Sequence, residues 1–94
     1  MAQFVVRMKT IDLRKAELQP VEGEDVKTLQ ALLNLFLTAG DVGEDGTPIL
    51  PLTLDGIAGA ATKQAALAFQ TAAHLATDGI VGPLTWRKLI ERDF

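Results

Sequence analysis

The sequence contains no cysteine and only one histidine, and these two shortages remove several kinds of chemistry. Without cysteine the chain forms no disulfide, no thiolate nucleophile and no cysteine-ligated metal site. His74 alone cannot hold a zinc ion, because zinc is bound by several protein ligands at once. We therefore expect neither a metal nor any other cofactor.

Long apolar runs and concentrated positive charge are also missing. No run approaches the roughly 20 apolar residues of a membrane-spanning helix. Residues 1–7 have too short an apolar run for a signal peptide, and no small-residue cleavage site follows them. The basic residues form no patch of the kind that binds nucleic acid. We expect no membrane span, no nucleic-acid partner and no secretory leader in this sequence.

Aromatic residues are few, whereas alanine and leucine supply much of the apolar content, a composition that suits helices better than strands. At 94 residues the chain predicts one domain with a small core. The net charge of −3 is unevenly spread. Residues 1–20 carry four bases against two acids, residues 21–55 carry seven acids against one base, and residues 56–94 carry four bases against three acids.

The second half of the chain contains the pattern D-G-I-x-G-x-x-T twice, at Asp55–Thr62 and Asp78–Thr85. Asp-Gly is a turn dipeptide, because glycine adopts positive φ freely and aspartate hydrogen-bonds its own downstream backbone. The second glycine suits a helix N-cap, and Pro83 suits a first helical position. The threonines then lie in first helical turns, near free N–H groups. Each copy predicts a turn, an apolar anchor and a helix start.

Hydrophobic periodicity predicts three helices, at about residues 25–39, 60–73 and 83–91. The first begins at a cap that we assign to Glu24 or Asp25, and acids are favoured there by the helix dipole. The third is short, so packing rather than propensity must hold it. The apolar stripe of the first helix contains Val26, Leu29, Leu33, Phe36 and Leu37.

Two other segments complete the predicted architecture. Alternating residues over about 4–13 predict a short strand or extended arm, followed by a loop marked by Pro20 and Gly23. Residues 41–54 predict a long loop whose apolar second half lies against the core. The sequence therefore predicts a mainly α fold, a small three-helix bundle with a short extended N-terminal segment and a long loop between helices 1 and 2.

The order of these motifs resembles the peptidoglycan-binding-like domain family, a small three-helix cell-wall-targeting module. The family pattern reads V-x-x-L-Q-x-x-L, D-G-x-x-G-x-x-T, A-x-x-x-F-Q and D-G-x-x-G-P-x-T-W-x-x-L. Its four parts match Val26–Leu33, Asp55–Thr62, Ala65–Gln70 and Asp78–Leu89. Two tandem D-G motifs with F-Q between them make the resemblance specific over about residues 24–91. Ala58 and Ala60 depart from it, since the family often has an aromatic residue and a proline there.

The resemblance implies non-catalytic binding of bacterial cell-wall peptidoglycan, through its stem peptide or glycan, that targets an attached or co-released wall hydrolase. It implies a domain at residues 24–94, preceded by an arm or short strand at residues 1–23. The expected location is the cell envelope or the exterior, as a phage lysis product or a fragment of a larger secreted protein. No nucleophile–base pair or paired-carboxylate arrangement is legible, so we expect no enzyme. The alternative is a protein–protein interaction or structural module on the same fold without glycan binding.

The candidate ligand-binding residues come from the two D-G motifs and the helix between them. They are Asp55, Gly56, Thr62, Gln70, His74, Asp78, Gly79, Thr85 and Trp86. One functional hypothesis places a groove between the two helix starts that follow the D-G turns. Free N–H groups at helix starts favour anions, so such a groove suits the carboxylates and amides of a stem peptide.

Each candidate also has a structural interpretation. The aspartates form turns whose carboxylates accept backbone N–H groups. Trp86 either stacks on a sugar or packs in the core, at helical spacing with Leu89 and Ile90. Gln70, like Gln30, either contacts ligand or is a buried amide that ties down a loop. His74 is either an exposed loop residue or a ligand contact.

Overall fold

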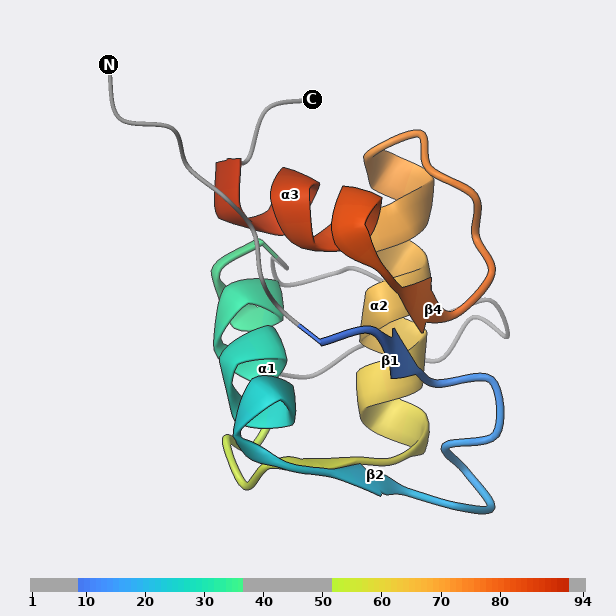
Figure 1. The fold of residues 1–94 in the computed structure, drawn as a ribbon, viewed down its shortest axis with the longest axis vertical. Coiled ribbons are helices and arrows are strands. Elements are labelled where there is room, and N and C mark those ends of the chain that lie inside the picture. Colours follow the sequence, from blue (N-terminus) through green and yellow to red (C-terminus); the bar gives the residue numbers. More distant parts are fainter. Residues whose placement is uncertain (1–8, 37–51, 92–94) are drawn as a thin grey trace.

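The structure is a computed structural model that describes residues 9–36 and 52–91. This part of the chain contains three helices, α1 (Glu24–Phe36), α2 (Ala60–Ala72) and α3 (Pro83–Glu91) (Figure 1). It also contains four strands of two residues each, namely β1 (Ile11–Asp12), β2 (Val21–Glu22), β3 (Ile57–Ala58) and β4 (Ile80–Val81). The predicted mainly α, three-helix fold is confirmed.

The four short strands form two separate antiparallel pairs. Strand β1 pairs with β4, and β2 pairs with β3. The pairs are extended by Leu13 N–H, which donates to Gly79 O at 2.8 Å, and by Gly23 N–H, which donates to Gly56 O at 3.0 Å. Each D-G motif is therefore held by backbone bonds to a segment that precedes α1.

The predicted N-terminal strand is confirmed only at residues 11–12. Residues 9 and 10 are not in a strand, and residues 1–8 lie outside the described part of the chain. The sequence did not predict β2, which falls in the expected loop at 20–23, or strands within the D-G motifs. Strands of two residues leave no alternation to detect, and these form because each finds a partner distant in sequence.

The starts of the three helices share one feature, a glycine whose carbonyl accepts the first helical hydrogen bond. Lys27 N–H donates to Gly23 O at 3.3 Å, and the equivalent bonds reach Gly59 O at 3.0 Å and Gly82 O at 2.9 Å. The predicted cap of the first helix at Glu24 or Asp25 was wrong, because both acids lie inside its first turn. Helices α2 and α3 confirm their predicted ranges to within one residue, whereas the predicted end of the first helix near 39 lies outside the described residues.

The core is built around Trp86 and Phe69, the two largest of its fully buried side chains. The rings of Phe36 and Phe69 meet edge to face, with centroids 4.8 Å apart. The segment before α1 also enters this core, where it buries Ile11, Leu13 and Ala16. Trp86 Nε1 donates to Lys9 O at 2.9 Å. The division expected at residue 23 thus crosses a shared core, and we propose that residues 9–36 and 52–91 belong to one folding unit.

The loop between α1 and α2 is described only from Leu52 onward. Leu52 is buried, and its backbone exchanges two hydrogen bonds with the Asn34 side chain, at 2.9 and 2.7 Å. This end of the loop lies against α1 and the core, as its apolar character predicted. Leu54, two residues later, is exposed. In the described part of the chain, no helix has the length and apolarity needed to cross a membrane.

Candidate functional site

The second D-G motif is organised around the side chain of Gln70, which is completely buried on α2. Its Nε2 lies within hydrogen-bond distance of three acceptors: Asp78 Oδ1 at 3.1 Å, Ile80 O at 3.0 Å and Thr85 Oγ1 at 3.2 Å. Its Oε1 accepts the backbone N–H of Gly79 at 3.1 Å. One amide therefore holds the turn, the strand and the helix start together.

The first D-G motif is built in the same way around Gln30 on α1. Gln30 Nε2 reaches Asp55 Oδ1 at 3.2 Å, Ile57 O at 3.1 Å and Thr62 Oγ1 at 3.3 Å. Gln30 Oε1 accepts the N–H of Gly56 at 3.1 Å. Corresponding distances in the two sets agree within 0.1 Å. We call these sets the Gln30 network and the Gln70 network.

The aspartate in each network closes its own turn. Asp55 Oδ1 accepts the N–H of Ile57 at 2.9 Å, and Asp78 Oδ1 accepts the N–H of Ile80 at the same distance. The Ile57 N–H, together with the Gln30 amide, holds the pKa of Asp55 below its ordinary value, because both donors favour the charged carboxylate. The Oδ2 atoms of Asp55 and Asp78 make no hydrogen bond within the described residues. These two exposed oxygens remain available to a ligand.

The predicted site residues divide sharply by exposure. Thr62, Gln70, Thr85 and Trp86 are buried, and their polar atoms bond to protein groups. The structure therefore favours the interpretation of Trp86 as a core residue over stacking on a sugar. The two motif glycines are buried as well. Only Asp55, His74 and Asp78 among the nine candidates present exposed side chains.

His74 ends helix α2 in a conformation that is uncommon for its residue type. Its φ is 60°, and it is the non-glycine residue with positive φ in the described part of the chain. Its N–H donates to Thr71 O at 3.2 Å, while Leu75 N–H donates to Gln70 O at 2.9 Å. This bond pair is a Schellman motif, whose left-handed position is normally glycine. His74 is thereby fixed in place with its side chain in solvent.

The structure does not join the two networks into one pocket. No hydrogen bond links them among residues 9–36 and 52–91, and Figure 1 shows α2 and α3 beginning at different strand pairs. The predicted groove between these two helix starts therefore has no support from the arrangement of the elements. A hollow of about 230 Å³ lies instead between residues 9–11 and residues 21–26. None of its lining residues belongs to either D-G motif.

Ion pairs brace the N-terminal segment next to the Gln70 network. Arg14 makes a forked contact with Asp12, whose shortest distance is 2.7 Å, and Lys63 on α2 reaches Glu17 at 3.0 Å. The Arg14 guanidinium lowers the pKa of Asp12 to about 2. The Lys63 ammonium also lowers the pKa of Glu17. Of the two pairs, only Lys63–Glu17 links the segment to α2, and exposed pairs of this kind add little stability on their own.

The candidate site predicted from the sequence left out Gln30. The signal for Gln30 was its place in the L-Q pair of the first helix, matching F-Q in the second. No pattern could reveal the hollow, because its two walls, residues 9–11 and 21–26, belong to different strand pairs and meet only in the folded structure. No group of three or more His, Asp or Glu side chains within the described ranges could hold a metal ion.

Comparison with known proteins gives these motifs a family. A sequence profile described as "Putative peptidoglycan binding domain" matches residues 22–89. An uncharacterized protein from the bpoA1 3′ region of Kitasatospora aureofaciens is 41% identical over 71 residues. That alignment covers 76% of this chain and 52% of the relative, so the chain spans about half the length of this relative. No solved structure matches the chain significantly. Because the profile covers most of the sequence, including both networks, this chain belongs to the peptidoglycan-binding domain family.

Proposed function

We propose that this chain binds bacterial cell-wall peptidoglycan without cleaving it, and that it thereby targets an attached or co-released wall hydrolase. The observation that carries the proposal is the family match over residues 22–89, which contains both D-G motifs. The physical support is that the carboxylate of each exposed aspartate accepts a hydrogen bond from a buried glutamine, which fixes its position. A surface that is already ordered loses less conformational entropy when it binds.

The expected binding mode is polar contact with peptide groups of the wall. Asp55 and Asp78 each keep one carboxylate oxygen free to accept an N–H from a stem peptide. A single module of this size binds with modest affinity. A polymer that repeats the ligand, or a linked second domain, raises retention through a high effective concentration. The proposed location is therefore the cell envelope or the exterior, whether the chain is a phage lysis product or a fragment of a secreted protein.

The proposal is tested by sedimenting the purified chain with insoluble, protein-free sacculi. The wild-type chain should pellet with sacculi and be released by soluble muropeptides. Asp55→Asn and Asp78→Asn keep the Oδ1 acceptor of each network but replace the free oxygen with a donor. We expect each to reduce the bound fraction, whereas Glu91→Gln on α3 should not. Wild-type chain that stays in the supernatant at high wall excess would contradict the proposal.

The alternative is that this chain binds a protein partner and no glycan. Exposed leucines on three different segments favour it, since Leu18, Leu35 and Leu84 are 80%, 63% and 68% exposed. Capture of a defined protein by the chain, with no pelleting on sacculi, would support this alternative. A turbidity assay on a cell-wall suspension distinguishes these two binding functions from wall hydrolysis. We expect the chain to leave the turbidity of the suspension unchanged.

A further inference from the structure

The hollow between the N-terminal segment and the start of α1 has features of a small binding site. Its volume of about 230 Å³ exceeds that of several water molecules, each of which takes roughly 30 Å³. Its lining includes Ile11, Val21 and Val26, of which Ile11 and Val26 are buried in the core. The hollow therefore has an apolar floor that is fixed by packing.

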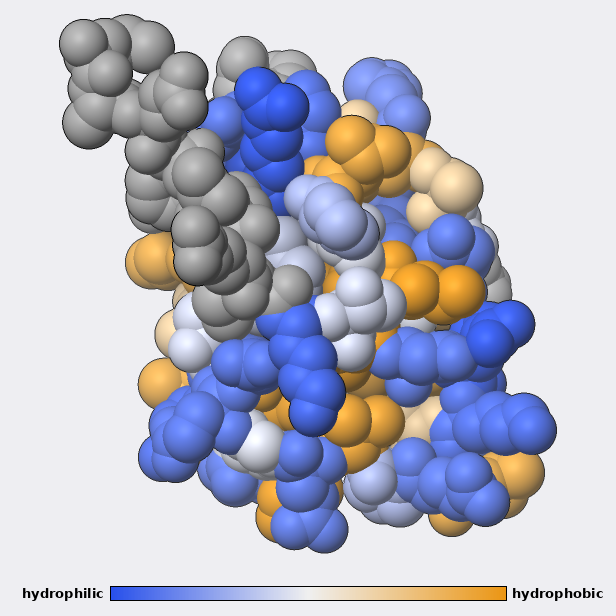
Figure 2. Space-filling model, viewed as in Figure 1, coloured by the Kyte–Doolittle hydropathy of each residue, from blue (hydrophilic) through white to orange (hydrophobic). Residues whose placement is uncertain are grey.

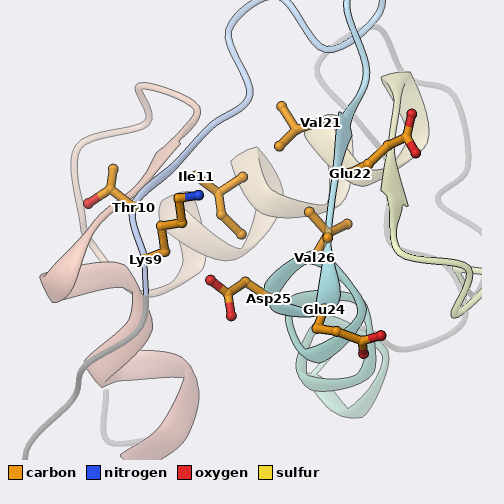
Figure 3. A pocket seen from close by; sticks show the side chains of 9 residues that line it. Lys9, Thr10, Ile11, Val21, Glu22, Glu24, Asp25 and Val26 are labelled. Atoms are coloured by element: carbon orange, nitrogen blue, oxygen red, sulfur yellow. The ribbon is translucent and has the colours of Figure 1, made fainter.

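Two side chains of opposite charge, Lys9 and Asp25, line this hollow. Figure 3 shows the Asp25 carboxylate pointing from the start of α1 toward the segment that carries Lys9, while Glu22 and Glu24 point away from it. No ion pair joins Lys9 and Asp25 in the described structure. One wall of the hollow, residues 9–11, therefore carries an ammonium, and the other, residues 21–26, carries a carboxylate that makes no ion pair with it.

The acids at this hollow differ from all others in the described part of the chain. Outside it, every described carboxylate accepts a hydrogen bond or forms an ion pair; these residues are Asp12, Glu17, Asp55, Asp78 and Glu91. Side chains of Glu22, Glu24 and Asp25 make neither contact within residues 9–36 and 52–91. Of these three, Asp25 is the acid whose carboxylate points toward the segment that carries Lys9 (Figure 3).

We propose that this hollow binds the free amino-acid end of a diamino acid side chain in a peptidoglycan stem peptide. The ligand ammonium pairs with Asp25, the ligand carboxylate pairs with Lys9, and its methylene groups lie against Val21, the half-buried apolar residue of the lining. The proposal rests on the proposed function, because it makes this hollow the part of the module that reads stem-peptide chemistry. A ligand with only an ammonium or only a carboxylate forms only one of the two ion pairs and therefore binds more weakly.

The test is an NMR titration of the whole chain with meso-2,6-diaminopimelic acid. Two probes of matched carbon chain serve as comparisons, namely cadaverine, which lacks both carboxylates, and pimelic acid, which lacks both amines. Diaminopimelate should shift the backbone amides of Ile11 and of residues 21–26 more strongly than either comparison does. Asp25→Asn and Lys9→Gln should each weaken binding about two- to fivefold, the range expected for exposed ion pairs. The matched controls Glu91→Gln and Lys15→Gln should leave it unchanged.

Parallel sedimentation with sacculi separates this inference from the function beneath it. If the chain pellets but the amides around the hollow do not move, or move equally with cadaverine or pimelate, the inference is overturned and wall binding stands. If the wild-type chain does not pellet, the proposed function fails, and the assignment of a stem-peptide ligand fails with it. Selective shifts that both hollow variants weaken would establish the site.

Discussion

At the residue scale, the side chains that organise this domain are Gln30 and Gln70. A glutamine amide offers two donors and a carbonyl oxygen, and each of these buried amides uses both ends. No buried side-chain nitrogen or oxygen in the described residues lacks a hydrogen-bond partner. The sequence offered a buried amide that ties down a loop as one of two interpretations of these glutamines, beside contact with a ligand. It could not predict that both amides make the same set of bonds.

Replacing Gln70 with methionine should therefore destabilise the protein. The methionine side chain is similar in length to glutamine, but it leaves the buried N–H of Gly79 without an acceptor. We expect this to lower the free energy of unfolding by about 1–3 kcal/mol. Urea denaturation of Gln70→Met measures the loss. Gln19→Met, at an exposed position, is the matched control and should change little. Equal stability of the two variants would argue against the Gln70 network as a stabilising element.

His74→Gly should stabilise the fold. Histidine at φ 60° carries the steric strain of the left-handed region, roughly 1–2 kcal/mol, which glycine avoids. The greater freedom of glycine in the unfolded chain offsets about 0.5–1 kcal/mol of that gain. We expect a rise in the midpoint of thermal unfolding. A lower midpoint would contradict the assignment of strain, and loss of sacculus binding by this stable variant would identify His74 as a ligand contact.

At the element scale, the domain repeats one unit twice: a glutamine helix, a D-G turn, a two-residue strand and a glycine-capped helix. The sequence predicted the turns and helices because Asp-Gly, Pro83 and the apolar stripes are local signals. It missed the strand pairs because their partners, at 11–12 and 21–22, are distant in sequence and only two residues long. Figure 1 shows these strands linking the N-terminal segment to the two motifs.

Gly56 and Gly79 occupy equivalent positions in the two D-G turns, but we expect alanine to destabilise the protein by different amounts at the two sites. Gly56 and Gly79 both have φ 74°, so alanine is strained by about 1–2 kcal/mol at each. A Cβ on Gly56 would also lie 3.1 Å from the carbonyl oxygen of Gly23, whereas on Gly79 its nearest neighbour is an Arg14 side-chain carbon at 3.7 Å. Gly56→Ala should thus lower the free energy of unfolding more than Gly79→Ala. The reverse order in denaturant unfolding would contradict the close β2–β3 contact.

At the scale of the whole molecule, the segment before α1 shares a hydrophobic core with the three helices and pairs its strands with β3 and β4. Figure 2 shows hydrophilic residues over much of one face, with apolar residues gathered in smaller areas between them. The family match begins at residue 22, yet Ile11, Leu13 and Ala16 lie in the same core as the matched helices. The hollow depends on this arrangement, since one of its walls comes from residues 9–11. The sequence did not predict that residues 9–11 or residues 21–26 belong to a binding site.

Acid should destabilise the molecule through three carboxylates whose pKa values are lowered by folding: Asp12, Glu17 and Asp55. A lowered pKa means that the unfolded chain binds protons more readily, so stability is lost as pH falls. For Asp12 this loss spans pH 3.8 to about 2. Urea denaturation at several pH values measures it, and Asp12→Asn should flatten part of the slope. Stability that rises as pH falls through this window would contradict the ion-pair assignments.

The measurement that tests the account most directly is sedimentation of the wild-type chain with sacculi over a range of salt concentrations. The chain carries a net charge of −3, and non-specific attraction between exposed charges is screened by salt. If the domain recognises peptidoglycan, a fraction of the chain should still pellet at high salt, and soluble muropeptides should release it. Binding that disappears with salt, or that muropeptides do not compete, would show that the family fold is present here without its wall-binding function.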